Sequence, residues 1–292
     1  MLYSLENEFI KISAHPHGGE LHNLISKKEN TEFLWNGNPQ YWKYHSPILF
    51  PIVGKVKDGK YRVSNETYEL PQHGLARISE FEVVEKEKDF ITFSLKWDKD
   101  TLKVYPYKFE LLITYTLIKN SVKVTYTVRN LDDKKIYFSV GAHPAFLCPI
   151  MENETMDDYY FEFNEKENAK IMLLASGGLF IHEKEDYLKN EDKIHLSKEL
   201  FSNDALVFSD LKSTKISLKS KNHNKSLTMD YTGFPYLGLW SIATGAPFVC
   251  IEPWCGHADF IDFDGELKDK PGIVSLEENG VFERFYTLTV TE

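Results

Sequence analysis

Residues 108–130 read KFELLITYTLIKNSVKVTYTVRN, and this segment decides the fold. Apolar side chains occupy every second position of its first half, at Phe109, Leu111, Ile113, Tyr115 and Leu117. The same alternation resumes after a polar break at residues 119–121. A period of two places alternate side chains on opposite faces of a β-strand. Two such runs joined by a short polar turn predict an antiparallel β-hairpin.

Period-two alternation dominates the rest of the chain as well. The segment DFITFSLKW, residues 89–97, predicts a strand, and STKISLKSKNHNKSLTMDY, residues 213–231, predicts a second hairpin with its turn at 222–224. Three late strands are expected, within residues 236–242, 246–254 and 284–290. Helical periodicity is sparse, with one short turn expected over residues 197–203, and the acidic segment 151–191 is interpreted as solvated loops with embedded strands. We therefore expect an all-β fold, one large antiparallel β-sandwich domain covering residues 1–292.

Composition narrows the class of protein. Hydrophobic residues make up 42% of the 292 residues, which is ordinary for a globular protein with a substantial core. The net charge of −10 argues against nucleic acid or an anionic membrane surface as the main partner. No apolar run is long enough for a transmembrane helix, and the first residues do not resemble a signal peptide. Cys148, Cys250 and Cys255 are therefore expected to be free thiols of a cytoplasmic protein.

Glu252 is the first candidate for chemistry. It follows the continuous apolar run Phe248–Ile251, which is typical of a strand buried on both faces. Burial disfavours the charged form of a carboxyl group and raises its pKa toward the range of a general base. The alternative is a structural carboxylate paired with a nearby Arg or Lys.

His143 is the second candidate, in the segment FSVGAHPAF at residues 138–146. The glycine allows a close approach of the backbone, and Pro144 prevents the strand from continuing normally. An imidazole at a strand end can face an approaching ligand. Alternatively, it simply forms hydrogen bonds within its own corner.

Three further residues are candidates for binding. The segment HGLAR places His73 and Arg77 around a glycine, and the guanidinium fork of an arginine suits an oxygen-rich ligand. Asp204 could accept hydrogen bonds from paired sugar hydroxyls or could cap a short helical turn. The alternative for His73 and Arg77 is a structural role, as a surface arginine beside a histidine in a turn.

Metal and nucleotide motifs are weak. His15 and His17 have the spacing of a ligand pair, but Pro16 and two glycines favour a turn, and no matching histidine cluster is evident on the following strands. Cys250 and Cys255 lack the Cys-x-x-Cys spacing. Glycine-rich nucleotide loops and the serine-hydrolase motif are absent from the sequence.

Taken together, GAHPAF at 141–146, HGLAR at 73–77 and Ile-Glu-Pro-Trp at 251–254 resemble the aldose 1-epimerase (galactose mutarotase-like) family. The LacX-like branch is the most similar. The resemblance extends over GGEL at 18–21, EFLWNGNPQYW at 32–42 and SPILFPIVGKVKDGKY at 46–61. It implies a β-sandwich of the supersandwich kind and a cofactor-free reaction on a hexose.

The sequence also departs from the best-studied galactose mutarotases. Their acid histidine precedes an aromatic and amide-containing motif, whereas Pro-Ala-Phe follows His143. Gly54-Lys55 stands where their sugar-contact loop has Gly-Arg, so Arg77 is expected to carry more of the cationic contact.

The resemblance implies an isomerase that interconverts the α and β anomers of an aldohexose. Glu252 would be the base and His143 the acid, on opposite sides of the bond that breaks. His73, Arg77 and Asp204 would hold the sugar, with neither metal nor cofactor, and Trp254 or Phe146 could offer a ring face. Three alternatives stay open: a hexose-6-phosphate 1-epimerase, a non-catalytic sugar-binding protein on the same fold, and a metal-dependent cupin-like isomerase.

Overall fold

The predicted hairpin forms the centre of one half of the molecule. The computed structural model describes residues 1–292. Strands β10 (Phe109–Ile118) and β11 (Ser121–Asn130) pair along their whole length, and Lys119 turns between them with a φ of 52°. Buried and partly exposed side chains alternate along both strands, as the period predicts. The hairpin prediction is confirmed.

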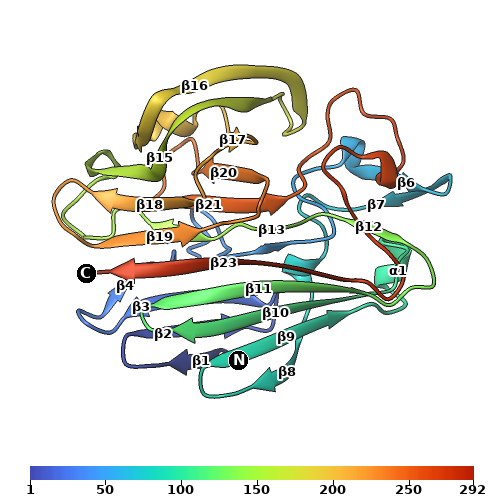
Figure 1. Ribbon diagram of the computed structural model, residues 1–292, viewed down its shortest axis with the longest axis horizontal. Helices are drawn as coiled ribbons and strands as arrows, with labels where there is room; N and C mark the ends of the chain where they lie inside the picture. Colours follow the sequence, from blue (N-terminus) through green and yellow to red (C-terminus); the bar gives the residue numbers. More distant parts are fainter.

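Fifteen strands make up the principal sheet, which runs across the molecule in Figure 1. Thirteen strands form its continuous path, in the order β5 (Ile48–Leu49), β13 (Val140–Ala142), β21 (Phe248–Cys255), β20 (Tyr236–Trp240), β17 (Leu206–Phe208), β15 (Tyr159–Leu174), β18 (Lys215–Ser220), β19 (Ser226–Asp230), β23 (Val281–Thr291), β11, β10, β9 (Phe90–Lys96) and β8 (Glu82–Lys86). Two strands lie off this path: β14 (Ala145–Leu147) pairs with β21, and β16 (Phe180–His195) pairs with β15.

Smaller elements complete the fold. A four-stranded sheet contains β1 (Tyr3–Glu6), β2 (Ile10–His15), β3 (Glu20–Ser26) and β4 (Thr31–Glu32), and two-stranded sheets pair β6 (Lys60–Val63) with β7 (Glu66–Glu69) and β12 (Ile136–Phe138) with β22 (Val274–Leu276). The helical elements are short: α1 (Thr101–Val104) and the 3-10 turns η1 (Lys57–Gly59), η2 (Ala76–Ile78), η3 (Met156–Asp158), η4 (Lys198–Phe201) and η5 (Leu267–Asp269). None of these helices has the length and apolar character needed to cross a membrane.

Every pairing between named strands is antiparallel. The layers enclose one main hydrophobic core of 65 buried residues. Large rings such as Phe50, Phe109 and Phe138 pack together inside it, with centroids 5.0 to 5.7 Å apart. The predicted all-β antiparallel sandwich is therefore confirmed. The prediction that residues 1–292 form one domain stays a prediction, and the single main core supports it.

Most individual strands appear where alternation predicts them. The second hairpin is β18–β19, the three late strands are β20, β21 and β23, and the expected helical turn is η4. The strand over residues 89–97 is β9, but its second face is buried as well. There the Thr92 hydroxyl lies 2.9 Å from the Thr114 hydroxyl and Ser94 donates a hydrogen bond to Glu110, so polar side chains fill that face without loss of hydrogen bonds.

Residues 151–191, interpreted from the sequence as solvated loops with embedded strands, contain far more strand than loop. Most of this segment belongs to β15 and β16, a long antiparallel hairpin that forms one end of the molecule in Figure 1. Register shifts interrupt the pairing at four places, for example between Glu162 and Glu167. Most side chains of β16 are exposed, and only Phe180, Leu188 and Ile194 are buried, so the sequence of this strand shows little apolar alternation.

Candidate active site

One interrupted strand brings the two principal candidates together. Strands β13 and β14 both pair with β21, and His143 and Pro144 fall in the gap between them. Gly141 pairs with Trp254 before the gap, and Ala145 pairs with Cys250 after it. Glu252 lies on β21 between these two partners, so it faces the interruption. Pro144 has no N–H for the ladder, which explains why regular pairing stops here.

His143 and Glu252 are in contact. Nε2 of His143 lies 3.2 Å from Oε2 of Glu252, and the two residues are only 7% and 2% exposed. The structure places them side by side, whereas the sequence analysis expected them on opposite sides of the reacting bond. Nδ1 of His143 is buried and has no hydrogen-bond partner.

Burial acts on the two groups in opposite directions. It raises the pKa of Glu252 well above its ordinary value, and the charge of Asp204 adds to the increase. The indole N–H of Trp254, which lies close to Glu252 without forming a hydrogen bond, acts in the other direction. Burial lowers the pKa of His143 to about 3, and the positive charge of Arg77 contributes to the decrease. The site therefore favours a carboxylic acid beside a neutral imidazole.

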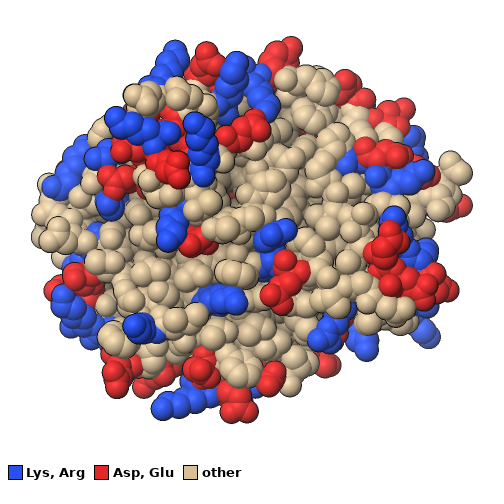
Figure 2. Space-filling model, viewed as in Figure 1, with Lys and Arg blue, Asp and Glu red and all other residues tan.

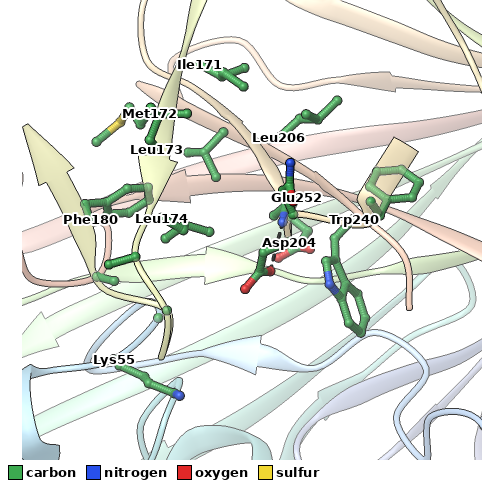
Figure 3. Close-up of a pocket in the computed structure, with 18 of the residues that line it drawn as sticks. Lys55, Ile171, Met172, Leu173, Leu174, Phe180, Asp204, Leu206, Trp240 and Glu252 are labelled. Atoms are coloured by element: carbon green, nitrogen blue, oxygen red, sulfur yellow. Dashed lines mark hydrogen bonds between the residues drawn. The ribbon is translucent and has the colours of Figure 1, made fainter. Parts of the chain in front are cut away.

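A cavity of about 1210 Å³ opens over this pair. The five predicted site residues all line it: His73, Arg77, His143, Asp204 and Glu252. Figure 3 shows Asp204 directly beside Glu252, with Lys55 on the opposite side of the cavity. An apolar wall of Ile171, Met172, Leu173, Leu174 and Phe180, from β15 and β16, completes the view. The predicted residues thus share one site.

His73 is fixed by its backbone. Its φ of 67° lies in the left-handed region, and its N–H donates to the carbonyl of Gly54 at 2.7 Å. The Gly54 N–H donates to Nδ1 of the ring at 3.2 Å, so the proton of a neutral imidazole lies on Nε2, 3.3 Å from the side-chain amide of Gln72. Burial lowers the pKa of His73 well below its ordinary value, and the neighbouring His143 adds to this effect. His73 is therefore a neutral hydrogen-bond donor.

Gly74 explains part of this geometry. Its φ is 74°, and a Cβ at this position would lie 2.3 Å from the carbonyl oxygen of Phe50. Only glycine permits this approach without a shift of the backbone. The ring of His73 then meets the ring of His143 edge to face, with centroids 5.5 Å apart.

Arg77 lies on η2 and is partly buried at the cavity wall. Nη2 donates to the carbonyl of Gln72 at 2.7 Å, and the guanidinium carbon lies 5.0 Å from the centre of the Tyr44 ring. Its Nε is buried without a partner. These contacts hold the guanidinium plane and leave donors for a ligand.

Asp204 follows η4 rather than capping its start, so the predicted alternative of an N-cap is wrong. It adopts a left-handed φ of 80°, and its Oδ1 accepts a hydrogen bond from the N–H of Ala205 at 2.8 Å. The side chain is exposed toward the cavity, and Oδ2 has no protein partner among the hydrogen bonds of the site.

Sequence reasoning missed two rings that flank the imidazole. The Trp42 ring lies 4.8 Å from the His143 ring at 32°, and the Trp240 ring lies 5.5 Å away at 84°. Both line the cavity, as does Trp254. Phe146, the other suggested ring face, is fully buried in the core and does not line it. Because Trp42 and Trp240 reach His143 only through the tertiary fold, the local pattern gave no signal for either.

Two groups of residues have side chains of the types that bind metal ions. His15 and His17 form the expected turn, with Gly18 and Gly19 at positive φ, and Nδ1 of His17 lies 2.7 Å from Oε1 of Glu80. In the site itself, His143, Cys250 and Glu252 could offer ligand atoms within 4.8 Å of one another. Burial raises the pKa of Cys250 well above its ordinary value, and a protonated thiol is a poor metal ligand.

Comparisons with known proteins agree with this architecture. A family model described as aldose 1-epimerase matches residues 1–273. The chromosomal protein LacX of Lactococcus lactis subsp. lactis is 34% identical over 298 residues, covering 99% of both chains. A galactose mutarotase related enzyme from Lactobacillus acidophilus superposes with a TM-score of 0.95 at 35% identity, covering 100% of this chain and 98% of the other. A galactose mutarotase-like protein from Lactobacillus casei ATCC 334 gives a TM-score of 0.93 at 29% identity, with both chains fully covered.

Proposed function

This chain belongs to the aldose 1-epimerase family, and from that premise we propose that it interconverts the α and β anomers of an aldohexose. The observation that carries the proposal is the buried contact between His143 and Glu252 on the wall of the cavity. A hexose opens when the C1 hydroxyl loses its proton and the ring oxygen gains one. These two oxygens are both bonded to C1, so they are close enough for two touching side chains to serve both.

In our proposal the two residues share one exchangeable proton. With that proton on Nε2 of His143, Glu252 accepts the C1 hydroxyl proton while His143 protonates the ring oxygen. The C1–ring oxygen bond breaks, the C1 carbonyl forms, and the pair is left as a carboxylic acid and a neutral imidazole. This is the charge state that burial favours. After rotation about the C1–C2 bond, the reverse transfers close the ring as the other anomer.

The surrounding residues suit a polar, neutral ligand. We propose that His73 donates from Nε2, that Arg77 donates from its guanidinium and that Asp204 accepts from hydroxyl groups. Trp42 and Trp240 provide apolar ring faces next to His143. Orienting the sugar in this way removes an entropic part of the barrier.

The charges of the cavity favour a free sugar over a phosphorylated one. Its charged lining residues comprise two cations, Lys55 and Arg77, and three acids, Glu185, Asp204 and Glu252. Nζ of Lys55 already donates to the carbonyl of Gly177 at 2.7 Å. Even with Glu252 protonated, the two cations are matched by Glu185 and Asp204, so the cavity has no excess positive charge to hold a phosphate dianion.

Polarimetry tests the proposal. Freshly dissolved α-glucose and α-galactose should approach anomeric equilibrium faster with the protein than without it, with no added metal or nucleotide. A faster reaction of glucose 6-phosphate than of glucose would instead favour the hexose-6-phosphate alternative. Sugar binding without acceleration would indicate a binding protein, and activity that is lost with a chelator and restored by a divalent ion would point to metal chemistry.

A further inference from the structure

A second cluster of polar side chains lies outside the cavity. It consists of Glu20, His22 and His45, each of which offers one ligand atom within 4.8 Å of the others. Glu20 and His22 lie two residues apart on β3, where the register with β2 shifts, and their side chains approach each other to 3.5 Å. His45 comes from the segment after Trp42, which crosses over β3 at this point. No such cluster is evident in the sequence, because His45 meets Glu20 and His22 only through the tertiary fold.

The carboxylate of Glu20 is held in one orientation and is only partly used. Oε1 accepts hydrogen bonds from the backbone N–H groups of His45 and Ser46, at 2.6 and 2.8 Å. Oε2 remains available and lies 3.5 Å from Nε2 of His22. Glu20 is only 6% exposed, so Oε2 lies on the buried side of the cluster.

His45 provides the second observation. Its ring stacks on that of His22, with centroids 3.8 Å apart and planes at 15°. On the other side the ring lies against Gly37, where a Cβ would approach its Cε1 to 2.4 Å. Nδ1 of His45 is buried without any hydrogen-bond partner, and such a group is costly unless something binds to it.

A further ring, His15, stacks on His22 with centroids 5.5 Å apart.

We propose that Glu20, His22 and His45 form a binding site for a divalent transition metal ion such as Zn²⁺. Two imidazole nitrogens and one carboxylate oxygen are a donor set that suits zinc and its neighbours, with the open positions filled by water. Calcium and magnesium prefer oxygen ligands alone. Because the two rings are stacked, binding requires the partly exposed His22 to turn so that its lone pair meets the ion.

The position of the site suggests its consequence. A bound ion would connect β3 to the segment between Gly37 and Ser46, which carries Trp42 and Tyr44. Trp42 contacts His143, and the ring of Tyr44 lies against Arg77. The metal would thus fix one wall of the cavity without entering it.

Calorimetric titration of the chelator-treated full-length protein with ZnCl₂ tests the proposal. We expect one ion per chain. Glu20→Gln keeps an acceptor for the two backbone N–H groups but removes the charge, and His22→Ala removes a nitrogen ligand. Replacing a residue that only supports a metal ligand typically weakens metal binding by roughly 10- to 100-fold. Each of these variants removes a direct ligand, so each should weaken zinc binding by at least that factor. His17→Ala, on the adjacent turn, is the matched control and should bind zinc like the wild type.

Two further readouts separate this site from the cavity. Zinc should raise the thermal midpoint of the wild type and of Glu252→Gln, but not that of Glu20→Gln. Cobalt substitution should give visible absorption without a thiolate charge-transfer band, since the cluster contains no cysteine. The proposal is overturned if the wild type binds no zinc, if Glu20→Gln and His22→Ala bind it normally, or if Glu252→Gln abolishes binding and the cobalt form shows the thiolate band of Cys250.

Discussion

Nε2 of His143 and Oε2 of Glu252 lie 3.2 Å apart, and both side chains are almost completely shielded from water. At this distance the protonation of one residue changes the proton affinity of the other, so the two titrate as a unit. The contact arises because the two strands on either side of His143 pair with the same partner strand, β21. Acid and base are therefore positioned by the sheet itself rather than by mobile loops, which favours a fixed reacting geometry.

Removing either member of this pair should collapse the same transition state. Glu252→Gln keeps the size and hydrogen-bonding capacity of the side chain but loses the base, and His143→Asn loses the titrating group. We expect each variant to lower kcat by about 10²- to 10⁴-fold, the usual contribution of one acid–base residue. The increase in activation free energy in the double variant should be well below the sum of the two single increases, because the residues act together. Polarimetry on fresh α-glucose measures the rates.

The control for these variants is His195→Asn, which changes an exposed histidine outside the cavity and should keep wild-type turnover. Circular dichroism should show that all variants remain folded. Near-wild-type turnover in Glu252→Gln would remove the proposed mechanism from consideration.

The dependence of kcat/KM on pH should be bell-shaped. The pair is competent while it holds one exchangeable proton: it gains a second in acid and loses its only one in alkali. Burial lowers the pKa of His143 to about 3 and raises that of Glu252, so both limbs move outward and the plateau is broad. Stopped-flow polarimetry across the stable pH range measures the profile. In residual Glu252→Gln activity the alkaline limb should disappear, and an alkaline limb that persisted unchanged there would assign it to another group.

Much of the fold follows from local alternation, and the exceptions have physical causes. The β10–β11 hairpin pairs without a single register shift, so its period survives in the sequence. The β15–β16 hairpin projects from the core, and most side chains of β16 are exposed, so few apolar residues mark this strand in the sequence. Alternation predicts a strand only where one of its faces is buried.

The site was predictable only in part, for a related reason. Glu252 and His143 each break an apolar strand, so a carboxylate after Ile251 and a histidine before Pro144 are visible in the chain itself. Trp42 and the Glu20 cluster depend on which segments cross in space. Burial decides the charge states, and it comes from the complete core rather than from any one segment.

Arg77→Lys should weaken catalysis although it preserves the charge. The guanidinium is held by the Gln72 carbonyl and the Tyr44 ring, and a lysine ammonium cannot reproduce this planar arrangement. We expect kcat/KM for α-glucose to fall by about 10- to 100-fold, which corresponds to the loss of one charged hydrogen bond of about 1.5–3 kcal/mol. Arg62→Lys, in a surface ion pair with Asp264, is the matched control. Unaltered kinetics in Arg77→Lys would place this residue outside the sugar contacts.

Stability should decrease as the pH falls below about 6.5, because the fold buries several neutral histidines. Burial lowers the pKa of His143 to about 3 and that of His257 to about 4, and it lowers that of His73 as well. Between these values and the ordinary 6.5, the unfolded chain binds protons that the folded protein does not. Acid therefore favours unfolding, by up to about 1.4 kcal/mol per pH unit for each histidine.

Glu252 acts in the opposite direction, because its raised pKa lets the folded protein hold a proton that the unfolded chain has released. One such group does not cancel three histidines, so the net slope should keep its sign. Urea unfolding at pH 7.5, 6.5, 5.5 and 4.5 measures the free energy of unfolding. His143→Asn should flatten the decline between pH 6.5 and 4.5, whereas His195→Asn, at an exposed position, should leave it unchanged. A free energy of unfolding that stayed constant or rose over this interval would mean that these histidines are protonated in the folded protein, and the neutral imidazole proposed beside Glu252 would then be wrong.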